Sequence, residues 1–227
     1  MPKLTRSTPS RSVSPAVEDY LKAIFRLEGL LGEPVSTNAL ADALGVRQSS
    51  ISGMLRKLDD LGLVSYEAYR GFSLSDEGRT AALSVIRRHR LLELFLAEEL
   101  GVPWDEVHDE AEMLEHALSP RLCDRIAAKL GYPSIDPHGD PIPPAVGAFV
   151  EPATAPLAAV GVGETCHLVR VSDRDPEVLR ILSANGIGLG TEFVVVDRGD
   201  DGSISVRVGH DTCTLASEVV RAIRVEP

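Results

Sequence analysis

The segment His108-Asp-Glu-Ala-Glu-Met-Leu-Glu-His116 carries residue types that bind a divalent cation. If the segment is helical, Glu112, Glu115 and His116 lie on one face, because residues three and four positions apart are neighbours on a helix. Carboxylates gathered on one face repel each other and lose hydration unless a cation lies between them. The segment therefore predicts a metal site. A solvated acidic helix face is the alternative, and taken alone it is the commoner origin of such a cluster.

Further candidate ligands lie outside this segment. His89 and Glu93 are spaced i, i+4 on a predicted long helix, and His108 precedes the acidic cluster by one turn. Asp19 lies off the apolar stripe of the first predicted helix. Each of these has another explanation when taken singly. Asp19 suits the positive end of a helix dipole, and His89 is compatible with a core or surface histidine beside three arginines.

Apolar positions that recur every three or four residues, bounded by Ser or Thr before and Gly after, predict the helices that would position these side chains. They span residues 15–31, 37–44, 48–61, 76–100, 105–118 and 120–130. The apolar stripe of the helix at 105–118 is Val107, Ala111, Leu114 and Leu118. Residues 63–74 alternate between apolar and polar and turn near Arg70-Gly71, which predicts a hairpin. Three helices followed by a hairpin indicate a winged helix-turn-helix.

The second and third of these helices have the pattern of a DNA-reading pair. Their packed inside is predicted to be Ala41, Leu44, Val46, Ile51, Leu55 and Leu58, around a turn at Gly45. The third helix begins with small polar residues, which a recognition helix needs because its first side chains meet base edges. The predicted DNA contacts are Arg47, Gln48, Ser49, Ser50, Ser52, Arg56 and Lys57, with Tyr69 and Arg70 in the hairpin. A protein-interaction module is the alternative.

Composition restricts the class of protein. The 227 residues are 44% hydrophobic and 25% charged, which is typical of a soluble globular protein. No apolar run approaches a membrane span, and no signal peptide is recognised, so we expect a cytoplasmic protein without a membrane partner. The three cysteines, Cys123, Cys166 and Cys213, lie far apart and predict neither a disulfide framework nor a thiolate zinc site.

The net charge of −11 is unevenly distributed. Residues 1–80 contain ten Lys or Arg and ten Asp or Glu, so the whole excess lies in residues 81–227. A neutral N-terminal third joined to an acidic remainder suggests that one part faces an anion and the other binds cations.

The pattern changes after residue 133. Seven prolines between 133 and 156 exclude regular elements over most of that stretch, and part of it is predicted to be a linker. Beyond it, short β-type runs are predicted at 166–171, 192–196, 203–208, 212–215 and 219–225, with one helix at 176–184. These runs indicate a small β-barrel of about 70 residues.

Several motifs, in order, resemble the diphtheria toxin repressor family of metal-dependent repressors. They are Glu18-Asp-Tyr-Leu-Lys-Ala-Ile24, Arg88-His-Arg-Leu-Leu-Glu93, Val107-His-Asp-Glu-Ala-Glu112, Glu115-His116 and Gly139-Asp-Pro-Ile-Pro143. The resemblance implies a mainly α fold with a small β domain: a winged helix-turn-helix, a helical dimerisation domain and a C-terminal SH3-like β-barrel of the iron-transport-A type. The expected boundaries are a disordered tail at 1–13, the DNA-binding domain at 14–81, the metal-binding and dimerisation domain at 82–145, a linker at 146–157 and the SH3-like domain at 158–227.

By position, the resemblance implies a primary, activating metal site formed by Asp19, Glu112, Glu115 and His116. Iron-responsive members have methionine where this chain has Asp19 and cysteine where it has Glu112, whereas manganese-responsive members have Asp and Glu there. Hard carboxylate oxygens suit Mn²⁺, and thioether and thiolate favour softer ions. The resemblance is therefore to the manganese branch, which implies Mn²⁺ as the cofactor. Fe²⁺ or another divalent transition metal is the alternative cofactor, and an iron-dependent repressor is the alternative function.

The resemblance also implies an ancillary site, formed by His89, Glu93 and His108. The barrel of relatives adds oxygen ligands there, and the matching stretch of this chain leaves Asp173, Asp175 and Glu177 as alternatives. His138 matches a position that some manganese-responsive members use as a ligand.

One departure affects the expected number of ions. Short, two-domain manganese regulators have a glutamate ligand where this chain has Lys22. Their closely spaced binuclear site is therefore not expected here, and a separate ancillary site is.

The function that the resemblance implies is repression of metal-uptake genes by a homodimer that binds double-stranded operator DNA when it holds metal. A regulator that senses a small organic ligand is one rival, and it would need an apolar pocket with few polar groups. A metallohydrolase is another, but the cluster lacks an HExxH arrangement because Glu112 stands four residues before His116. We expect neither an organic ligand nor an enzyme.

Overall fold

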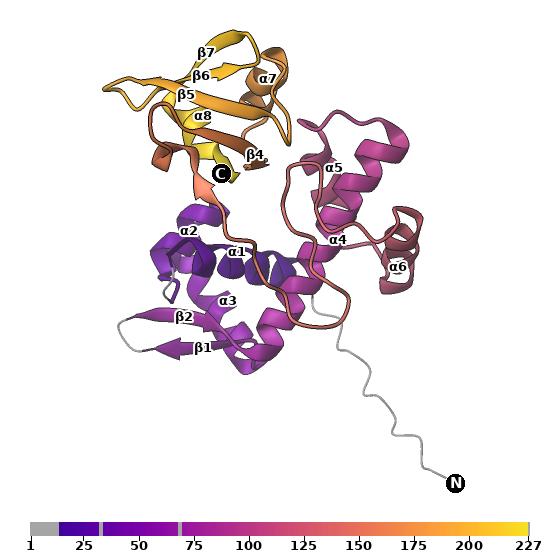
Figure 1. Ribbon diagram of the computed structural model, residues 1–227. Coiled ribbons are helices and arrows are strands. Elements are labelled where there is room, and N and C mark those ends of the chain that lie inside the picture. The colour runs from indigo at the N-terminus through magenta and orange to yellow at the C-terminus, as the bar shows by residue number, and fades with distance from the viewer. Residues whose placement is uncertain (1–13, 32–33, 68–69, 227) are drawn as a thin grey trace. The chain divides into compact units, whose positions relative to one another are not determined.

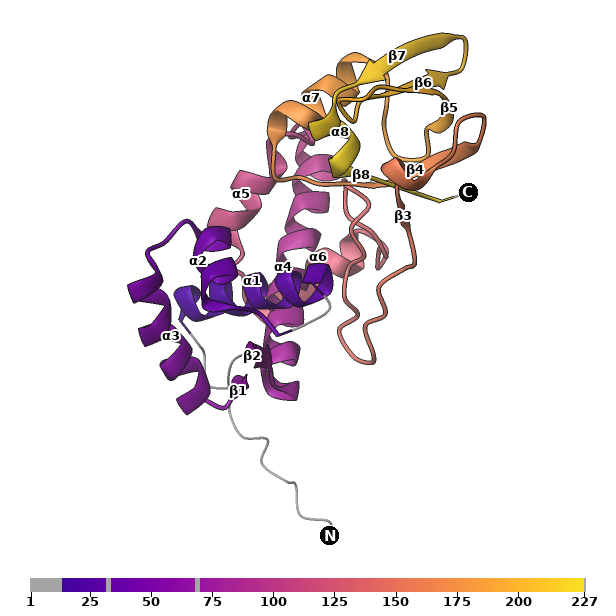
Figure 2. The same cartoon turned by 90° about the vertical axis from the view of Figure 1, so that its left-hand side faces the viewer.

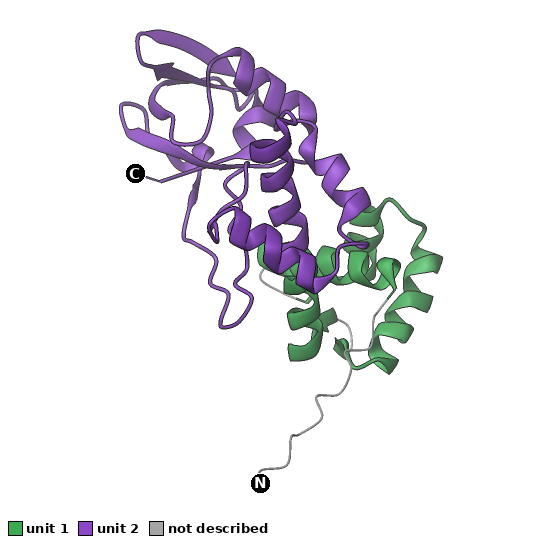
Figure 3. Cartoon of the chain, turned by 90° about the vertical axis from the view of Figure 1, so that its right-hand side faces the viewer, with its two compact units in different colours: residues 1–85 green, residues 86–227 purple. Residues whose placement is uncertain are grey.

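The computed structural model describes residues 14–31, 34–67 and 70–226. The chain forms two compact units, residues 1–85 and 86–227 (Figure 3). The predicted tail at 1–13 and the wing residue Tyr69 lie outside the described residues. The helix α4 (Asp76–Leu100) contributes its first ten residues to unit 1 and the rest to unit 2.

Unit 1 is the predicted winged helix-turn-helix (Figure 1). Its elements are α1 (Pro15–Leu31), α2 (Thr37–Leu44), α3 (Gln48–Asp60), β1 (Val64–Glu67), β2 (Gly71–Leu74) and the start of α4. The two strands are antiparallel, with Val64 opposite Leu74. The shared apolar core includes Val17, Leu21, Ile24, Leu40, Ile51, Leu55 and Leu58, all at most 1% exposed.

The turn between α2 and α3 follows from its residues. The Ser36 side chain caps α2 by accepting a hydrogen bond from the Ala39 N–H. Gly45 then ends the helix at φ +63°, a left-handed conformation that costs glycine little. The prediction that Val46 is part of the packed inside is wrong, because this residue is 40% exposed. Its backbone N–H instead closes the turn onto the Ala41 carbonyl.

The helical part of unit 2 consists of the end of α4, α5 (Val107–Leu114) and α6 (Pro120–Lys129). Their common core includes Leu91, Leu92, Leu94, Leu96, Val107, Ala111, Cys123, Ile126, Ala127 and Ile142. The stripe prediction is therefore correct at Val107 and Ala111. It is wrong at Leu114, which is 43% exposed.

The helix α5 is shorter than the predicted 105–118. After Leu114 the chain tightens, and the Ala117 N–H bonds to the Leu114 carbonyl three residues back. Further along, Ser119 is extended as the N-cap of α6 and Pro120 occupies its first turn. A residue before proline is disfavoured in the α region, so no helix could continue through Ser119. Glu115 caps α5, and His116 lies in the turn beyond it.

The C-terminal part of unit 2 is an SH3-like sheet. Six antiparallel strands are ordered β3-β8-β4-β5-β6-β7. The strands are β3 (Ala155–Pro156), β4 (Thr165–Val171), β5 (Glu192–Arg198), β6 (Ile204–Val208), β7 (Asp211–Leu215) and β8 (Ile223–Glu226), with η1 (Leu157–Ala159), α7 (Pro176–Ala184) and α8 (Ser217–Ala222). Figure 2 shows α7 and α8 beside the strands, and buried residues of both helices pack into the core with Leu168, Phe193 and Val206.

The strand predicted at 219–225 is wrong in its first half, which forms α8. Val219 and Val220 are consecutive and are only 1% and 2% exposed. Successive side chains of a strand point to opposite faces, so a strand here would expose one of the two valines. A turn of helix buries both against the core, and β8 follows directly.

Several contacts join the sheet to the helical part of unit 2. Trp104 Nε1 donates to Ser183 Oγ at 2.7 Å, and Arg180 Nε donates to Asp105 at 2.9 Å. At the other end, the Val171 N–H donates to the His138 carbonyl at 2.9 Å. An ion pair joins Arg170 of β4 to Asp140 at 2.5 Å. These contacts fix the chain segment after β4 beside α5.

Candidate metal centre

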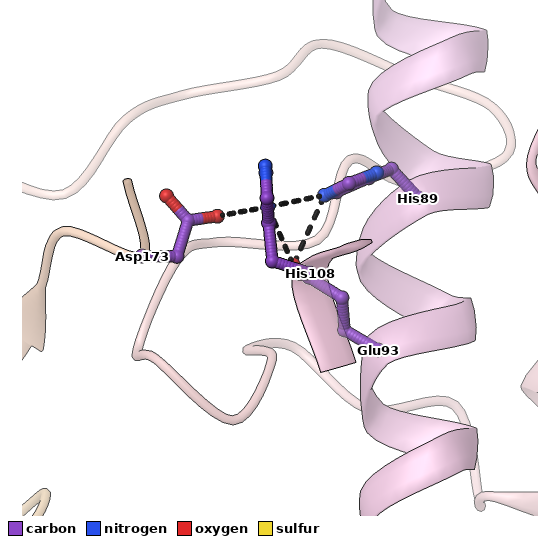
Figure 4. A group of neighbouring side chains, drawn as sticks. All are labelled: His89, Glu93, His108 and Asp173. Atoms are coloured by element: carbon purple, nitrogen blue, oxygen red, sulfur yellow. Dashed lines mark hydrogen bonds and ion pairs between the residues drawn. The ribbon is translucent and has the colours of Figure 1, made fainter. Parts of the chain in front are cut away.

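Four side chains from three parts of unit 2 converge on a compact cluster (Figure 4). His89 and Glu93 project from α4, His108 from α5 and Asp173 from the segment after β4. His108 Nδ1 is 2.9 Å from Asp173 Oδ2 and 3.3 Å from Glu93 Oε1. His89 Nε2 is 3.0 Å from Glu93 Oε1. One potential ligand atom from each residue lies within 4.8 Å of all the others, and we call this set the ancillary cluster.

Strong electrostatic coupling holds the ancillary cluster together without metal. Hydrogen bonds to Asp173 and then to Glu93 raise the pKa of His108 to about 10, although burial acts in the opposite direction. Burial alone would raise the pKa of Glu93, but hydrogen bonds from His108 and His89 outweigh it and lower that pKa to about 2. Burial of Asp173 is likewise outweighed by His108, and its pKa is lowered. A protonated His108 therefore lies between two carboxylates, where a metal cation would bind.

Two orphaned polar atoms support a cation at this place. Glu93 and His138 are both 0% exposed. Within the part of the chain that the structure describes, Glu93 Oε2 and His138 Nδ1 have no hydrogen-bond partner. His138 Nε2 bonds to the Trp104 carbonyl at 2.7 Å, and since a carbonyl only accepts, Nε2 carries the hydrogen and Nδ1 is the atom able to bind an ion. Buried polar groups are rarely left unpaired, so the residues present fit a bound divalent cation.

Asp136 is a neighbour of this site that the sequence analysis missed. It forms a compact group with Glu93 and His138, and all three are buried. Its Oδ1 accepts the backbone N–H groups of His138 and Asp140, both at 2.9 Å. Burial and the nearby Asp140 raise the pKa of Asp136 well above its usual value. Its position two residues before His138 was visible in the sequence, but that spacing carries no record of the contact with Glu93.

The three acidic candidate ligands after β4 have different contacts in the structure. Asp173 belongs to the ancillary cluster. Asp175 caps α7, because its side chain accepts the Glu177 N–H at 3.0 Å. Glu177 is exposed and pairs with Arg180 at 3.2 Å. The structure therefore brings only Asp173 of the three to the cluster, and the Asp-Pro helix start was the sequence signal that marks Asp175 as a cap.

The predicted primary ligands of unit 2 lie at and after the end of α5. Glu115 is fully buried, and His116 Nε2 is 3.5 Å from its Oε1. Glu112 retains 39% side-chain exposure and lies 4.0 Å from His89 Nδ1. His89 Nδ1 is only 2.7 Å from Glu115 Oε2, and one potential ligand atom from each of His89, Glu112 and Glu115 lies within a single compact group. The fourth predicted ligand, Asp19, is on α1 in unit 1.

The predicted DNA-contacting residues form the outer face of α3. Arg47, Gln48, Ser49, Ser50, Ser52, Arg56 and Lys57 are all exposed. Gln48 Nε2 donates to Asn38 Oδ1 of α2 at 2.5 Å, so Asn38 adds a polar group to this face that the sequence analysis missed. In the wing, Arg70 is exposed and pairs with Glu67 at 3.0 Å.

A winged helix-turn-helix joined to a buried carboxylate and imidazole site defines a metal-responsive DNA-binding protein. Comparison with known proteins specifies the class. Residues 12–72 match the family described as "Iron dependent repressor, N-terminal DNA binding domain". Residues 75–144 match "Iron dependent repressor, metal binding and dimerisation domain", and residues 155–227 match the "FeoA domain".

Individual proteins agree with these matches. The iron-dependent repressor IdeR of Mycobacterium leprae is 30% identical, with 92% of this chain and 96% of that protein covered. The regulator MntR of Oceanobacillus iheyensis is 39% identical over 52% of this chain and 80% of its own length. A solved structure of a manganese-dependent transcriptional repressor in complex with manganese is 46% identical, covers 92% of this chain and 98% of its own, and has a TM-score of 0.86.

The chain belongs to the iron-dependent repressor family, which includes the diphtheria toxin repressor, and it has the three-domain form. It is a metal-dependent DNA-binding repressor, and the family consists of transcriptional regulators, not enzymes. Its dimerisation domain and DNA-binding domain indicate a homodimer that binds operator DNA. In the described part of the chain, no helix has the length and apolar character needed to cross a membrane.

The protonated His108 makes the stability of the metal-free protein dependent on pH. Its pKa is raised from 6.5 when unfolded to about 10 when folded, so its stabilising contribution is complete below pH 6.5 and is lost as pH rises toward 10. We expect the melting temperature of chelator-treated protein to fall between pH 6.5 and 9, and to fall less in His108→Gln. Thermal unfolding across that range measures the difference. An equal fall of melting temperature with pH in the two proteins would contradict the raised pKa of His108 as its cause.

A second prediction concerns Gly139, where the 136–141 loop meets the sheet. Gly139 has φ +83°, and a Cβ there would overlap the Val169 carbonyl. We expect Gly139→Ala to push the loop from β4 and to weaken the binding of a divalent metal ion at the ancillary cluster. Gly163 is a matched control, since its φ is +87° but a Cβ there would meet nothing within 4 Å. Its replacement by alanine should show only the left-handed backbone cost of about 1–2 kcal/mol, with normal binding of a divalent metal ion.

Proposed function

We propose that this protein is a manganese-dependent repressor of metal-uptake genes. The observation that carries the proposal is the chemistry of the candidate ligands, which are carboxylates and imidazoles in both metal sets. In the described residues, no cysteine belongs to any of the compact ligand groups. Carboxylate-rich sets suit Mn²⁺ better than sets with thiolate or thioether ligands. The similarity to MntR and to a manganese-bound repressor supports this choice.

The primary site is proposed to consist of Asp19, Glu112, Glu115 and His116. Asp19 is included because of the sequence motif around it, and the other three because they occur together at the end of α5. A bound divalent ion would neutralise the charge of the carboxylates. Asp19 belongs to the DNA-binding unit and the other three to unit 2, and metal binding at this set is proposed to favour operator binding.

The ancillary site is proposed to consist of His89, Glu93, His108 and Asp173. His138 is a further ligand on the strength of its orphaned Nδ1 atom. Glu177 is not retained, because its carboxylate pairs with Arg180 on the exposed side of α7. Residues 14–81 are proposed to form the DNA-binding domain and residues 82–145 the metal-binding and dimerisation domain. Residues 146–157 are proposed to be a linker, and residues 158–227 the SH3-like domain.

The DNA-binding surface is proposed to be the exposed face of α3 with the wing. In a homodimer, two recognition helices would enter major-groove faces about 34 Å apart, or a multiple of this distance. Exposed apolar side chains of α5 and α6 supply a surface for the partner subunit: Met113 is 69%, Leu114 43% and Leu122 49% exposed. A contiguous apolar patch formed by such residues would mark a protein interaction site.

The experiment that tests the proposal is binding to promoter fragments upstream of metal-transporter genes, with Mn²⁺ and with chelator. Tight binding that needs Mn²⁺ and is reversed by chelator is expected. Affinity that is the same with chelator would contradict metal control. The alternative, an iron-dependent repressor, is favoured by the similarity to IdeR over nearly the whole chain. It predicts instead that anaerobic Fe²⁺ activates binding at lower concentration than Mn²⁺.

A further inference from the structure

Gly53 leaves a gap among the side chains on the outer face of α3. It lies in the interior of that helix, which runs unbroken from Gln48 to Asp60 and forms an outer edge of unit 1 (Figure 2). Glycine is the poorest helix former after proline, and in a helix interior it is less favourable than alanine. The domain therefore loses stability at this position, and that loss needs a physical reason.

Packing inside the protein does not supply the reason. Within the described part of the chain, a Cβ at Gly53 would meet no other element within 4 Å. The backbone there is helical, so alanine would fit without strain. Gly78 of α4 is a contrasting case, because a Cβ at that position would overlap the Leu63 carbonyl. The fold thus requires glycine at position 78 but not at position 53.

Gly53 lies at the centre of the outward face of α3. It follows the buried Ile51 by two residues and precedes the buried Leu55 by two. Successive residues of an α-helix are about 100° apart, so position 53 faces about 160° away from each of them. Its neighbours on the helix surface are three and four positions away, and all are exposed members of the proposed DNA-contacting set: Ser49, Ser50, Arg56 and Lys57.

A recognition helix without a side chain at this position can lie deeper in DNA. The major groove is about 12 Å wide and about 8.5 Å deep, and an α-helix with its side chains is about 10–12 Å across. The helix therefore fits the groove closely, and the centre of its outward face lies against the base edges. The missing side chain of Gly53 leaves space there for a group that belongs to the DNA.

The chemistry of that space indicates which group fills it. Glycine has no side-chain donor or acceptor, so Gly53 cannot read a base through a side-chain hydrogen bond. Among the features that bases present in the major groove, the 5-methyl group of thymine is the one that is read by apolar contact. An alanine methyl group at position 53 and a thymine methyl group have the same size, so the two would compete for one space.

We propose that Gly53 determines operator specificity by accommodating a thymine methyl group against the backbone of α3. This inference rests on the proposed DNA-binding surface and adds a base that the surface selects. The contact with DNA then offsets the loss of helix stability that glycine causes at this position.

The test uses the full-length protein, with whichever of Mn²⁺ and anaerobic Fe²⁺ supports binding, and DNA that the wild type selects from a randomised pool. Each thymine of the selected sequence is replaced in turn by uracil, which lacks only the methyl group. We expect a thymine in each half-site at which uracil lowers wild-type affinity. On the thymine duplex, Gly53→Ala should bind at least about fivefold more weakly than the wild type. Uracil at that position should restore its affinity, so the two changes do not add.

Thermal unfolding separates the effect on DNA binding from an effect on the fold. We expect Gly53→Ala to raise the melting temperature by about 2–4 °C, because alanine favours the helix, although it weakens operator binding. Ala43→Gly is the matched control, since it removes one methyl group from an exposed position of α2. It should lower the melting temperature and leave the affinity for both duplexes unchanged.

The outcomes separate this inference from the surface on which it rests. Wild-type affinity for the thymine duplex in Gly53→Ala would overturn the inference alone, and so would a loss of affinity that is equal on thymine and uracil duplexes at every position. Unaltered operator binding in both Arg56→Ala and Lys57→Ala would overturn the proposed surface and the inference with it. A wild-type protein that selects no DNA sequence would overturn the proposed function as well.

Discussion

Glu115→Gln is expected to abolish the Mn²⁺ response of operator binding while leaving the fold intact. Glu115 is fully buried at the end of α5, and His89 and His116 lie within 3.5 Å of its carboxylate oxygens. Glutamine has nearly the same shape but lacks the charge that a divalent ion needs. Because metal-linked couplings are typically about 5–150-fold, operator affinity in saturating Mn²⁺ should fall by that factor to the metal-free level.

Glu110→Gln is the matched control for that experiment. Glu110 lies on the same helix, is exposed and belongs to none of the compact ligand groups. It should keep the full Mn²⁺ response in an electrophoretic mobility or fluorescence anisotropy assay. Retention of the full response by Glu115→Gln as well would remove Glu115 from the primary site.

The double substitution Asp19→Met with Glu112→Cys is expected to shift the metal preference from Mn²⁺ toward Fe²⁺. The change replaces two hard oxygen ligands with a thioether and a thiolate, which favour softer ions. We expect the ratio of the half-activating Mn²⁺ and Fe²⁺ concentrations to change by about tenfold or more, which corresponds to at least about 1.4 kcal/mol. Anaerobic titration of operator binding with each ion measures it.

A thiol placed elsewhere on α5 controls for the chemistry of the new cysteine. Glu110→Cys introduces an exposed thiol on that helix without changing a proposed ligand. It should leave the preference for Mn²⁺ as it is in the wild type. An unchanged ratio in the double variant would show that the selectivity does not reside in Asp19 and Glu112.

The sequence predicted the unit 1 fold well because its signals are local. Ser36 and Gly45 bound α2 through a cap and a left-handed turn, and both are visible in the sequence. Apolar periodicity predicted the bounds of the elements less well in unit 2. It placed the end of α5 too late, and it missed the helix at Val219 and Val220, which depends on the core that buries both.

The metal centre was predictable only in its parts. Residues at i, i+4, such as His89 and Glu93, are adjacent on any helix, so that pair was expected from spacing alone. The proximity of Asp173 to His108 depends on how β4 packs beside α5, and spacing carries no record of it. Asp136 was missed for the same reason, since its contact with Glu93 and His138 arises from a loop whose course the prolines do not reveal.

The measurement that tests the central claim most directly is a parallel titration of operator binding with Mn²⁺ and anaerobic Fe²⁺, at matched free-ion concentrations. A manganese-dependent repressor predicts half-activation at a lower concentration of Mn²⁺ than of Fe²⁺, and complete loss of binding with chelator. Half-activation by Fe²⁺ at an equal or lower concentration would contradict the selectivity attributed to the carboxylates.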